Sequence, residues 1–147
     1  KEAMGAFVFE RYLKAKLWPE AVARIRALQA AGYAVVLVTG SLDFLVQPVA
    51  ALLGVDHVIA ASLEEDGHGR FTGRIEGAAV SDEEKRAQVR AYALEHGVDL
   101  ERSHAYGDSK ADLPLLEAVG VAHAVSPDPS LAAVARRRRW PILRWSA

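Results

Sequence analysis

Cysteine is absent from this chain of 147 residues. Its absence excludes a disulfide scaffold, a zinc site built on thiolates and a cysteine nucleophile. An excess of one charge is also lacking, since 18 Lys and Arg stand against 19 Asp and Glu. Binding to nucleic acid usually requires a distinctly basic surface. We therefore expect no nucleic-acid partner.

Long apolar segments are lacking too. No apolar run approaches the roughly 20 residues that span a bilayer, and no stretch resembles a cleaved signal peptide. We expect a cytoplasmic protein with no membrane partner. The hydrophobic share of 51% is nevertheless ample for a packed core, and the length suits about one domain.

Short apolar runs alternate with helical patterns along the chain. The runs predicted as strands are 34–38, 58–61, 103–106 and 121–125, with a possible edge strand at 140–143. The predicted helices are 1–16, 18–32, 42–53, 81–96, about 110–119 and about 128–138. The helix at 81–96 would begin with a capping box at Ser81 and Glu84. The Gly-rich stretch 63–77 predicts a hairpin. This order predicts an α/β fold with a Rossmann-like, doubly wound parallel sheet.

The Val-rich run 34–38 shows no alternation of polar and apolar residues, so it predicts a strand buried on both faces of the sheet. Ligands of such sheets bind beyond the carboxyl ends of the strands. Thr39, Gly40 and Ser41 follow this run and precede a predicted helix. Hydroxyl groups, a glycine and free helix N–H groups together suit an anion.

Two further segments carry chemistry near predicted strand or helix ends. Asp108 and Asp112, four residues apart, follow the predicted strand 103–106 and suit a hard cation such as Mg²⁺. Lys85 lies one turn inside its predicted helix and could bind phosphate as a point charge.

Each of these segments alone has an ordinary structural explanation. Thr39 to Ser41 could be a turn with a helix cap, Asp108 could be a cap as well, and Lys85 could be a solvated lysine. Their occurrence in order along one predicted sheet favours a site for phosphate and Mg²⁺.

The ordered set resembles the motifs of a known family. The segment 35–41 resembles its second motif, Glu83 to Lys85 its third, and 106–112 its fourth, with the pattern GD-x-x-x-D. The hairpin at 66–75 and the ending at 140–143 are typical of the same branch. The family is the haloacid dehalogenase superfamily, in its phosphoserine-phosphatase-like branch, subfamily IB. The resemblance extends over nearly the whole chain.

The resemblance implies a phosphohydrolase that forms an aspartyl-phosphate. Thr39, Gly40 and Ser41 would bind the transferring phosphoryl group, with Thr39 part of the catalytic site. Lys85 would neutralise the charge of the phosphoryl group and of the nucleophile.

The resemblance also implies a Mg²⁺ cofactor. Asp108 would bind the metal directly, while Asp112 would hold the metal's waters or orient Lys85. Ala111 departs from the pattern, since many relatives carry Asn there, and this removes a polar contact near the phosphate.

The first motif of the family is missing. It is a strand ending in Asp-x-Asp, whose first Asp is the nucleophile, and no Asp-x-Asp occurs in this chain. Asp43, the only acid near Thr39, falls inside a predicted helix. Family order places the motif before Lys1, on a central strand between those ending at Val38 and Tyr106.

We therefore expect a fragment of a longer phosphatase, which would be inactive by itself. Residues 1–16 would be the tail of a helical cap, and 17–147 an incomplete core. The first residue, Lys1 rather than Met, agrees with this expectation.

Several functional alternatives stay open. The substrate would be a small phosphorylated metabolite, with phosphoserine the first expectation and histidinol phosphate or a phospholipid head group the next. A catalytically inactive fragment, or a structural module that binds phosphate or Mg²⁺, is the non-enzymatic alternative. A receiver domain is disfavoured, because it needs an early acidic pair and a lysine after a late strand. The arginines at 136–139 are interpreted as a solvated helix end.

Overall fold

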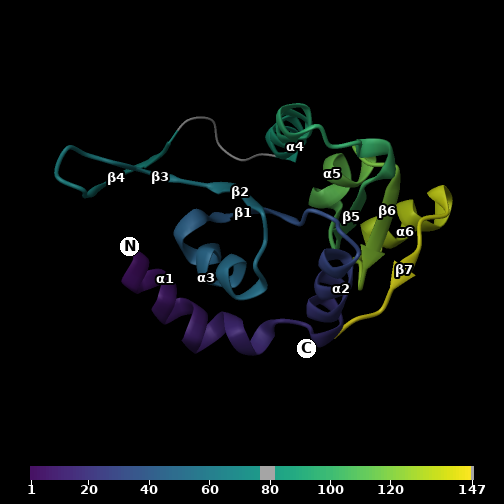
Figure 1. The fold of residues 1–147 in the computed structure, drawn as a ribbon, viewed down its shortest axis with the longest axis horizontal. Coiled ribbons are helices and arrows are strands. Elements are labelled where there is room, and N and C mark those ends of the chain that lie inside the picture. The colour runs from purple at the N-terminus through teal and green to yellow at the C-terminus, as the bar shows by residue number, and fades with distance from the viewer. Residues whose placement is uncertain (77–81, 147) are drawn as a thin grey trace. The chain divides into compact units, whose positions relative to one another are not determined.

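The computed structural model describes residues 1–76 and 82–146. These fall into two compact units, 1–76 and 82–146, whose elements are labelled in Figure 1. Ser81, the predicted cap of a helix, lies outside the described residues.

Three helical segments belong to the unit 1–76. Helix α1 (Glu2–Val8) continues through a π-helical turn (Phe9–Leu13) and a 3-10 turn (Lys14–Lys16), and it is followed by α2 (Pro19–Ala30) and α3 (Asp43–Leu53). The three predicted helices here are confirmed. Pro19 occupies the first turn of α2, where its missing N–H costs nothing. Gly54 ends α3 at a φ of 64°, in the left-handed region that favours glycine.

Helix α1 lies beside α3 (Figure 1). Gly5 makes the closest approach, because a Cβ atom at this position would collide with the backbone carbonyl of Phe44. Gly5 and Phe9 are buried, whereas Met4 and Phe7 are exposed. One side of the helical segment therefore packs on α3.

Strands β1 (Val36–Leu42) and β2 (His57–Ala61) pair in parallel, with α3 as the connection between them. The two predicted strands and their parallel direction are confirmed, although β1 extends beyond the predicted range 34–38 to Leu42. The prediction of a first strand buried on both faces is wrong, because Val36 to Thr39 are half-buried and Gly40 and Ser41 are exposed. The physical reason is that β2 is the one partner of β1 among the described strands.

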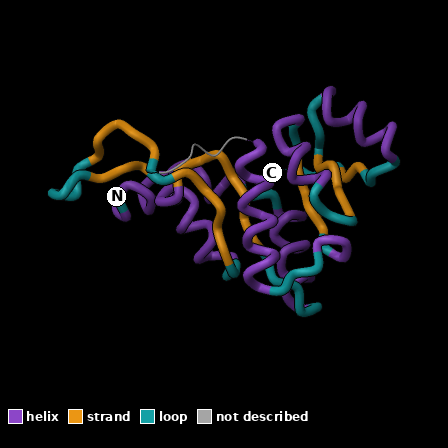
Figure 2. The backbone as a smooth tube through the Cα atoms, turned by 90° about the horizontal axis from the view of Figure 1, so that it is seen from above, coloured by secondary structure: helices purple, strands orange, loops and turns teal. Residues whose placement is uncertain are grey.

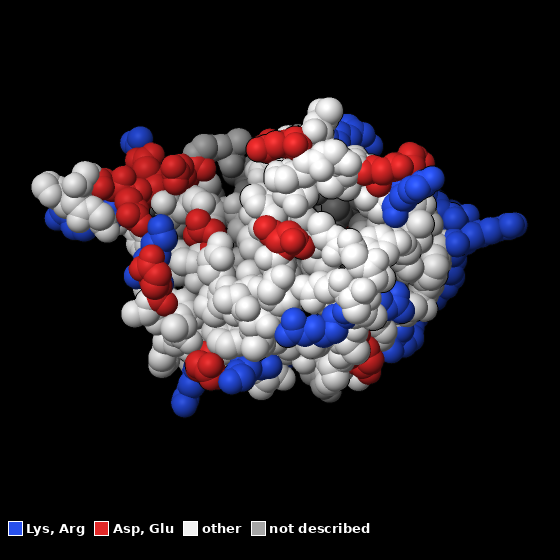
Figure 3. Space-filling view, viewed as in Figure 1, with Lys and Arg blue, Asp and Glu red and all other residues white. Residues whose placement is uncertain are grey.

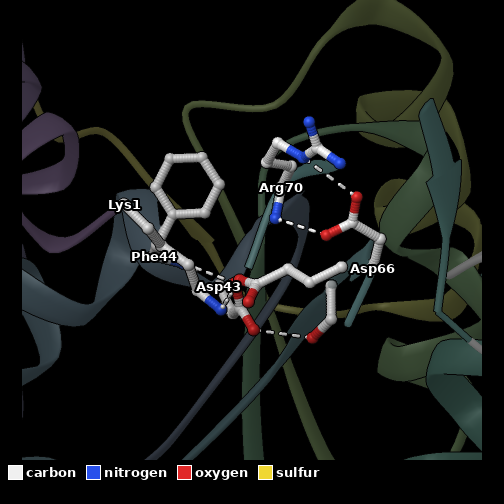
Figure 4. A network of polar contacts seen from close by, with 7 residues as sticks. Lys1, Asp43, Phe44, Asp66 and Arg70 are labelled. Carbon is white, nitrogen blue, oxygen red and sulfur yellow. Dashed lines mark hydrogen bonds and ion pairs between the residues drawn. The ribbon is translucent and has the colours of Figure 1, made fainter. Parts of the chain in front are cut away.

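The predicted hairpin is confirmed as β3 (Leu63–Glu65) and β4 (Phe71–Ile75), which are antiparallel; its two strands form the open loop in Figure 2. Asp66 organises the turn. Its Oδ1 accepts from the N–H groups of His68 at 2.8 Å and Arg70 at 3.0 Å, and its Oδ2 accepts from Arg70 Nε at 3.1 Å (Figure 4). All five residues of β4 are exposed.

The unit 82–146 contains a parallel sheet in the order β5–β6–β7, formed by His104–Gly107, Val121–Val125 and Ile142–Leu143. Its helices are α4 (Asp82–His96), α5 (Leu113–Glu117) and α6 (Pro129–Arg138), with 3-10 turns at Leu100–Arg102 and Lys110–Asp112. The predicted helix at about 110–119 is thus a 3-10 turn followed by a short α-helix, with Pro114 in its first turn.

The core of this unit lies against the sheet. Leu116 of α5, Ala124 of β6, and Leu131 and Ala135 of α6 are completely buried. Small alanine side chains let the two helices approach the sheet closely. This packing fixes the ends of β5 and β6, where the candidate site begins.

Basic side chains gather over α6 (Figure 3). Arg136, Arg137 and Arg138 lie in the last turn of that helix, where positive charge complements the helix dipole. Arg138 pairs with Glu117 at 3.0 Å and lies 5.2 Å from the ring of Trp140. Within 1–76 and 82–146, no helix combines the length and apolar character needed to cross a bilayer.

Candidate functional site

An acidic loop follows β5. The strand ends at Gly107, and the N–H groups of Asp108 and Ser109 both donate to Oδ2 of Asp112, at 2.9 and 3.2 Å. The Asp112 carboxylate therefore closes the loop on itself. The structure brings together the two acids that the sequence predicted as a pair.

Gly107 is required by this closure. A Cβ atom at Gly107 would lie 2.6 Å from the Cβ of Asp112, closer than such atoms approach in proteins. Any side chain there would push Asp112 away from the N–H groups that it accepts from. The Gly-Asp pattern thus has a packing reason as well as a chemical one.

A third carboxylate, Asp128, also reaches this loop. Strands β5 and β6 are parallel, so the chain leaves both at the same edge of the sheet. The N–H of Asp128 donates to the carbonyl of Asp108 at 2.9 Å. Its Oδ2 accepts from the Lys110 N–H at 3.3 Å, and its Oδ1 accepts from the Leu131 N–H at 2.8 Å.

Sequence reasoning gave Asp128 no functional role. The only signal was a cap, an Asp before Pro129 at the start of a predicted helix. That pattern says nothing about Lys110, which lies 18 residues earlier.

The carboxyl of Asp108 is electrostatically strained. Partial burial of the carboxyl group raises the pKa of Asp108, and the negative charges of Asp112 and Asp128 raise it further. Placing a cation beside Asp108 would relieve this repulsion, since an opposite charge favours the ionised form.

The donor chemistry suits a hard cation, but the set is partial. In the part of the chain that the structure describes, no group of three or more His, Cys, Asp or Glu residues could hold a metal ion. Oδ2 of Asp112 and both oxygens of Asp128 already accept backbone N–H groups. A direct metal role for Asp108 and a metal role for Asp112 both stay predictions.

The predicted phosphate loop lies on β1. Val38 pairs with Ile59 and Leu42 pairs with Ala61, so Thr39, Gly40 and Ser41 form an irregular bulge in the strand. The prediction that the strand ends at Val38 is therefore wrong, because pairing resumes at Leu42. Bulges of this kind occur beside active sites, where they redirect side chains.

Hydrogen bonds form within the bulge and at the start of α3. The Ser41 N–H donates to Thr39 Oγ1 at 3.0 Å. The carboxylate of Asp43, which begins α3, accepts from the Phe44 N–H and from Ser62 Oγ, both at 2.6 Å (Figure 4). Asp43 therefore has a local structural role.

Lys85 lies in the first turn of α4 and is half-buried. Thr39, Gly40 and Ser41 belong to the unit 1–76, whereas Lys85, Asp108 and Asp112 belong to the unit 82–146. A hydrogen bond thus joins Asp108 and Asp112, while the functional roles of all the predicted site residues stay predictions.

Parallel strands joined by helices, with an acidic loop at a strand end, define a Rossmann-like α/β core. A family model described as haloacid dehalogenase-like hydrolase matches residues 2–117. The chain belongs to the haloacid dehalogenase-like hydrolase family, as the motifs at Thr39, Lys85 and Asp108 suggested.

Relatives with assigned names include two phosphatases. The chain is 41% identical over 127 residues to the inhibition of morphological differentiation protein of Streptomyces azureus, covering 86% of this chain and 46% of that protein. It is 32% identical over 124 residues to a histidinol-phosphatase of Neisseria meningitidis, covering 82% and 56%. It is 33% identical over 140 residues to phosphoserine phosphatase SerB1 of Mycobacterium tuberculosis, covering 95% and 45%.

Solved structures show the same fold. A Bordetella pertussis protein of unknown function superposes with a TM-score of 0.87 at 35% identity, covering 96% of this chain and 64% of that one. A phospho-aspartyl intermediate analogue of phosphoserine phosphatase superposes with a TM-score of 0.68 at 27% identity, covering 84% and 56%. The chain spans about half the length of the curated relatives that it matches.

Proposed function

We propose that this chain is the larger part of the catalytic core of a Mg²⁺-dependent phosphomonoesterase. The observation that carries the proposal is the acidic loop after β5, in which Asp112 and Asp128 hold the backbone while Asp108 is left as the candidate ligand. Membership of the haloacid dehalogenase-like family supports the same chemistry.

The chain's own residues would bind and neutralise the phosphoryl group. Thr39 and Ser41 would donate their hydroxyls, and the bulged backbone at Gly40 would add its N–H group. Lys85 would offset negative charge on the phosphoryl oxygens. Fixed donors of this type stabilise the charge that develops in the transition state.

Asp108 would hold the metal, with Asp112 keeping the loop closed behind it. A bound Mg²⁺ supplies Lewis-acid stabilisation of a phosphoryl oxygen. The raised pKa of Asp108 fits this role. Burial and the neighbouring carboxylates disfavour the ionised form of Asp108, and a bound cation would favour it.

The nucleophile would come from outside these 147 residues. The first aspartate of the missing motif would attack phosphorus as the ester P–O bond breaks, and the second aspartate of that motif would protonate the leaving alcohol. Water, deprotonated by the same second aspartate, would then cleave the acyl-phosphate P–O bond, which regenerates the carboxylate and releases inorganic phosphate. Among the described strands, β1 has β2 as its one partner and β5 has β6, so each has an edge open to a further strand. The greater length of the relatives also supports a contribution from additional chain. In this proposal residues 1–16 form the tail of a helical cap.

The substrate class in this proposal is a small phosphorylated metabolite. Phosphoserine is the first candidate, because a relative and a structural neighbour bear the name phosphoserine phosphatase. Histidinol phosphate is the second, because another relative is named histidinol-phosphatase. The ratio of kcat/KM for the two substrates would choose between them.

Hydrolysis of p-nitrophenyl phosphate in Mg²⁺ tests the proposal. We define the extended protein as the form that also carries the residues encoded upstream of Lys1. We expect the extended protein to hydrolyse the ester and the 147-residue chain to be inactive. Activity of the short chain would show that the nucleophile lies within it. If neither form hydrolyses p-nitrophenyl phosphate, phosphoserine or histidinol phosphate, a non-catalytic module that binds phosphate or Mg²⁺ is favoured.

A further inference from the structure

Three consecutive backbone N–H groups in the acidic loop point at carboxylates. Those of Asp108 and Ser109 donate to Asp112, and that of Lys110 donates to Asp128. Asp112 belongs to the motif, whereas Asp128 comes from the loop after the neighbouring strand β6. The loop is therefore held from two sides.

Asp128 makes three contacts that tie separate segments together. Its N–H donates to the Asp108 carbonyl at 2.9 Å, and its Oδ2 accepts from the Lys110 N–H at 3.3 Å. Its Oδ1 accepts from the Leu131 N–H at 2.8 Å, which anchors the carboxylate to the first turn of α6. The completely buried side chain of Leu131 anchors that turn in the core.

The turn that presents Asp128 is itself fixed. Ser126 adopts a φ of 39°, which is unusual for a residue with a side chain. Its Oγ donates to the carbonyl of Trp145 at 2.6 Å and accepts from the Trp145 N–H at 2.9 Å. These bonds compensate for the backbone strain, so Asp128 starts from a defined position.

We propose that Asp128 is a positioning residue that holds the backbone of Asp108 to Lys110 in the arrangement needed for a divalent cation to bind at Asp108. This inference rests on the proposed function. In this account Asp128 is assigned no contact with the cation, and each of its oxygens instead accepts a backbone N–H group. It acts through the loop, and its negative charge adds to the field that favours a cation.

A role limited to capping α6 is the competing explanation, and the Asn variant separates the two. Asparagine caps helices about as well as aspartate. It has a single oxygen, however, and its NH₂ group can only donate. In Asp128→Asn the oxygen can retain the Leu131 N–H, but the amide nitrogen would then face the Lys110 N–H, and that hydrogen bond is lost.

Amide hydrogen exchange and Mg²⁺ titration of the ¹⁵N-labelled extended protein, which would also carry the first motif, test the proposal. In Asp128→Asn we expect exchange at Lys110 to rise about threefold to tenfold, while exchange at Leu131 stays within about twofold. The Mg²⁺ concentration that half-shifts the Ser109 amide resonance should rise at least about tenfold, as for other residues that support metal ligands.

Asp99→Asn is the matched control, because Asp99 also caps a helical turn in the same unit, accepting from the Glu101 N–H. It should leave both readouts unchanged. If Asp128→Asn leaves Lys110 exchange and the Mg²⁺ midpoint at their wild-type values, Asp128 is only a cap and the inference is wrong, while the proposed function stands. If the unsubstituted extended protein shows no Mg²⁺ response at Ser109, the metal assignment at Asp108 fails and takes the inference with it.

Discussion

At the scale of single residues, Asp108 combines a functional assignment with a cost in stability. Its pKa is raised in the folded state above the ordinary value of 3.8. The neutral carboxyl group therefore contributes to the free energy of unfolding, and this contribution is complete below pH 3.8. It is lost as the pH rises through the raised pKa, so the ionised carboxylate destabilises the fold at neutral pH.

Asp108→Asn should therefore raise the thermal midpoint at pH 7 in the absence of Mg²⁺. We expect a gain below about 1 kcal/mol, because the residue is exposed and water screens its charge. The gain should vanish below pH 3.8, where the wild-type carboxyl is protonated. Glu95→Gln, an exposed change on α4, is the control. A gain that is equal at both pH values would contradict the electrostatic explanation.

For Asp66 the pKa is shifted in the opposite direction from that of Asp108. The N–H groups of Arg70 and then His68 donate to its carboxylate and lower the pKa of Asp66 below 3.8. Its stabilising effect is present above that ordinary value and is lost as the pH falls through the lowered pKa.

We expect the hairpin to loosen on acidification. Exchange at the His68 and Arg70 amides, corrected for intrinsic rates, should accelerate as the pH falls below 3.8. In Asp66→Ala it should be fast at every pH, whereas Glu64→Gln on β3 should behave like the wild type. Protection of these amides in Asp66→Ala would show that the turn does not depend on the carboxylate.

At the scale of secondary-structure elements, the contact between α1 and α3 depends on Gly5. Alanine is intrinsically better than glycine in a helix by about 1 kcal/mol. At Gly5, however, a Cβ atom would strike the Phe44 carbonyl, and overpacking of this kind costs about 1–3 kcal/mol. The collision should outweigh the propensity, because rigid backbone, rather than a flexible side chain, is struck.

We therefore predict that Gly5→Ala lowers the urea midpoint of the unit 1–76. Gly67→Ala in the hairpin is the matched control, because a Cβ atom there meets nothing within 4 Å. An unchanged or higher midpoint for Gly5→Ala would mean that α1 moves away from α3 at little cost.

Sequence patterns predicted the elements better than the contacts between them. The strands at 57–61, 104–107 and 121–125 lie where apolar runs are bounded by turn residues, and a local pattern carries that information. The bulge at Thr39 to Ser41 was missed, because the glycine and the two hydroxyl residues look like the end of a strand, whereas pairing with β2 continues to Leu42.

The candidate site shows the same limit of prediction from sequence, because residues close in sequence were paired correctly and a distant contact was missed. The spacing of Asp108 and Asp112 revealed a pair that the structure joins through Oδ2 of Asp112. Asp128 was not assigned to the site, because its bond to Lys110 depends on the parallel pairing of β5 and β6 rather than on neighbouring residues. A helix cap and a residue that supports a site look identical in a single sequence.

At the scale of the whole molecule, the chain has a haloacid dehalogenase-like fold and relatives about twice as long as itself. We propose above all that Asp108 serves a Mg²⁺-dependent phosphomonoesterase whose nucleophile lies outside these residues. Asp108 can be tested directly, because the stability experiment above shows whether its substitution leaves the fold intact.

The most direct test is phosphate release by the extended protein and its Asp108→Asn and Glu95→Gln variants, measured across a Mg²⁺ titration with p-nitrophenyl phosphate. We predict Mg²⁺-dependent activity in the unsubstituted protein and in Glu95→Gln, and a loss of at least about a hundredfold in Asp108→Asn. Full activity of Asp108→Asn with an unchanged Mg²⁺ dependence would contradict the account.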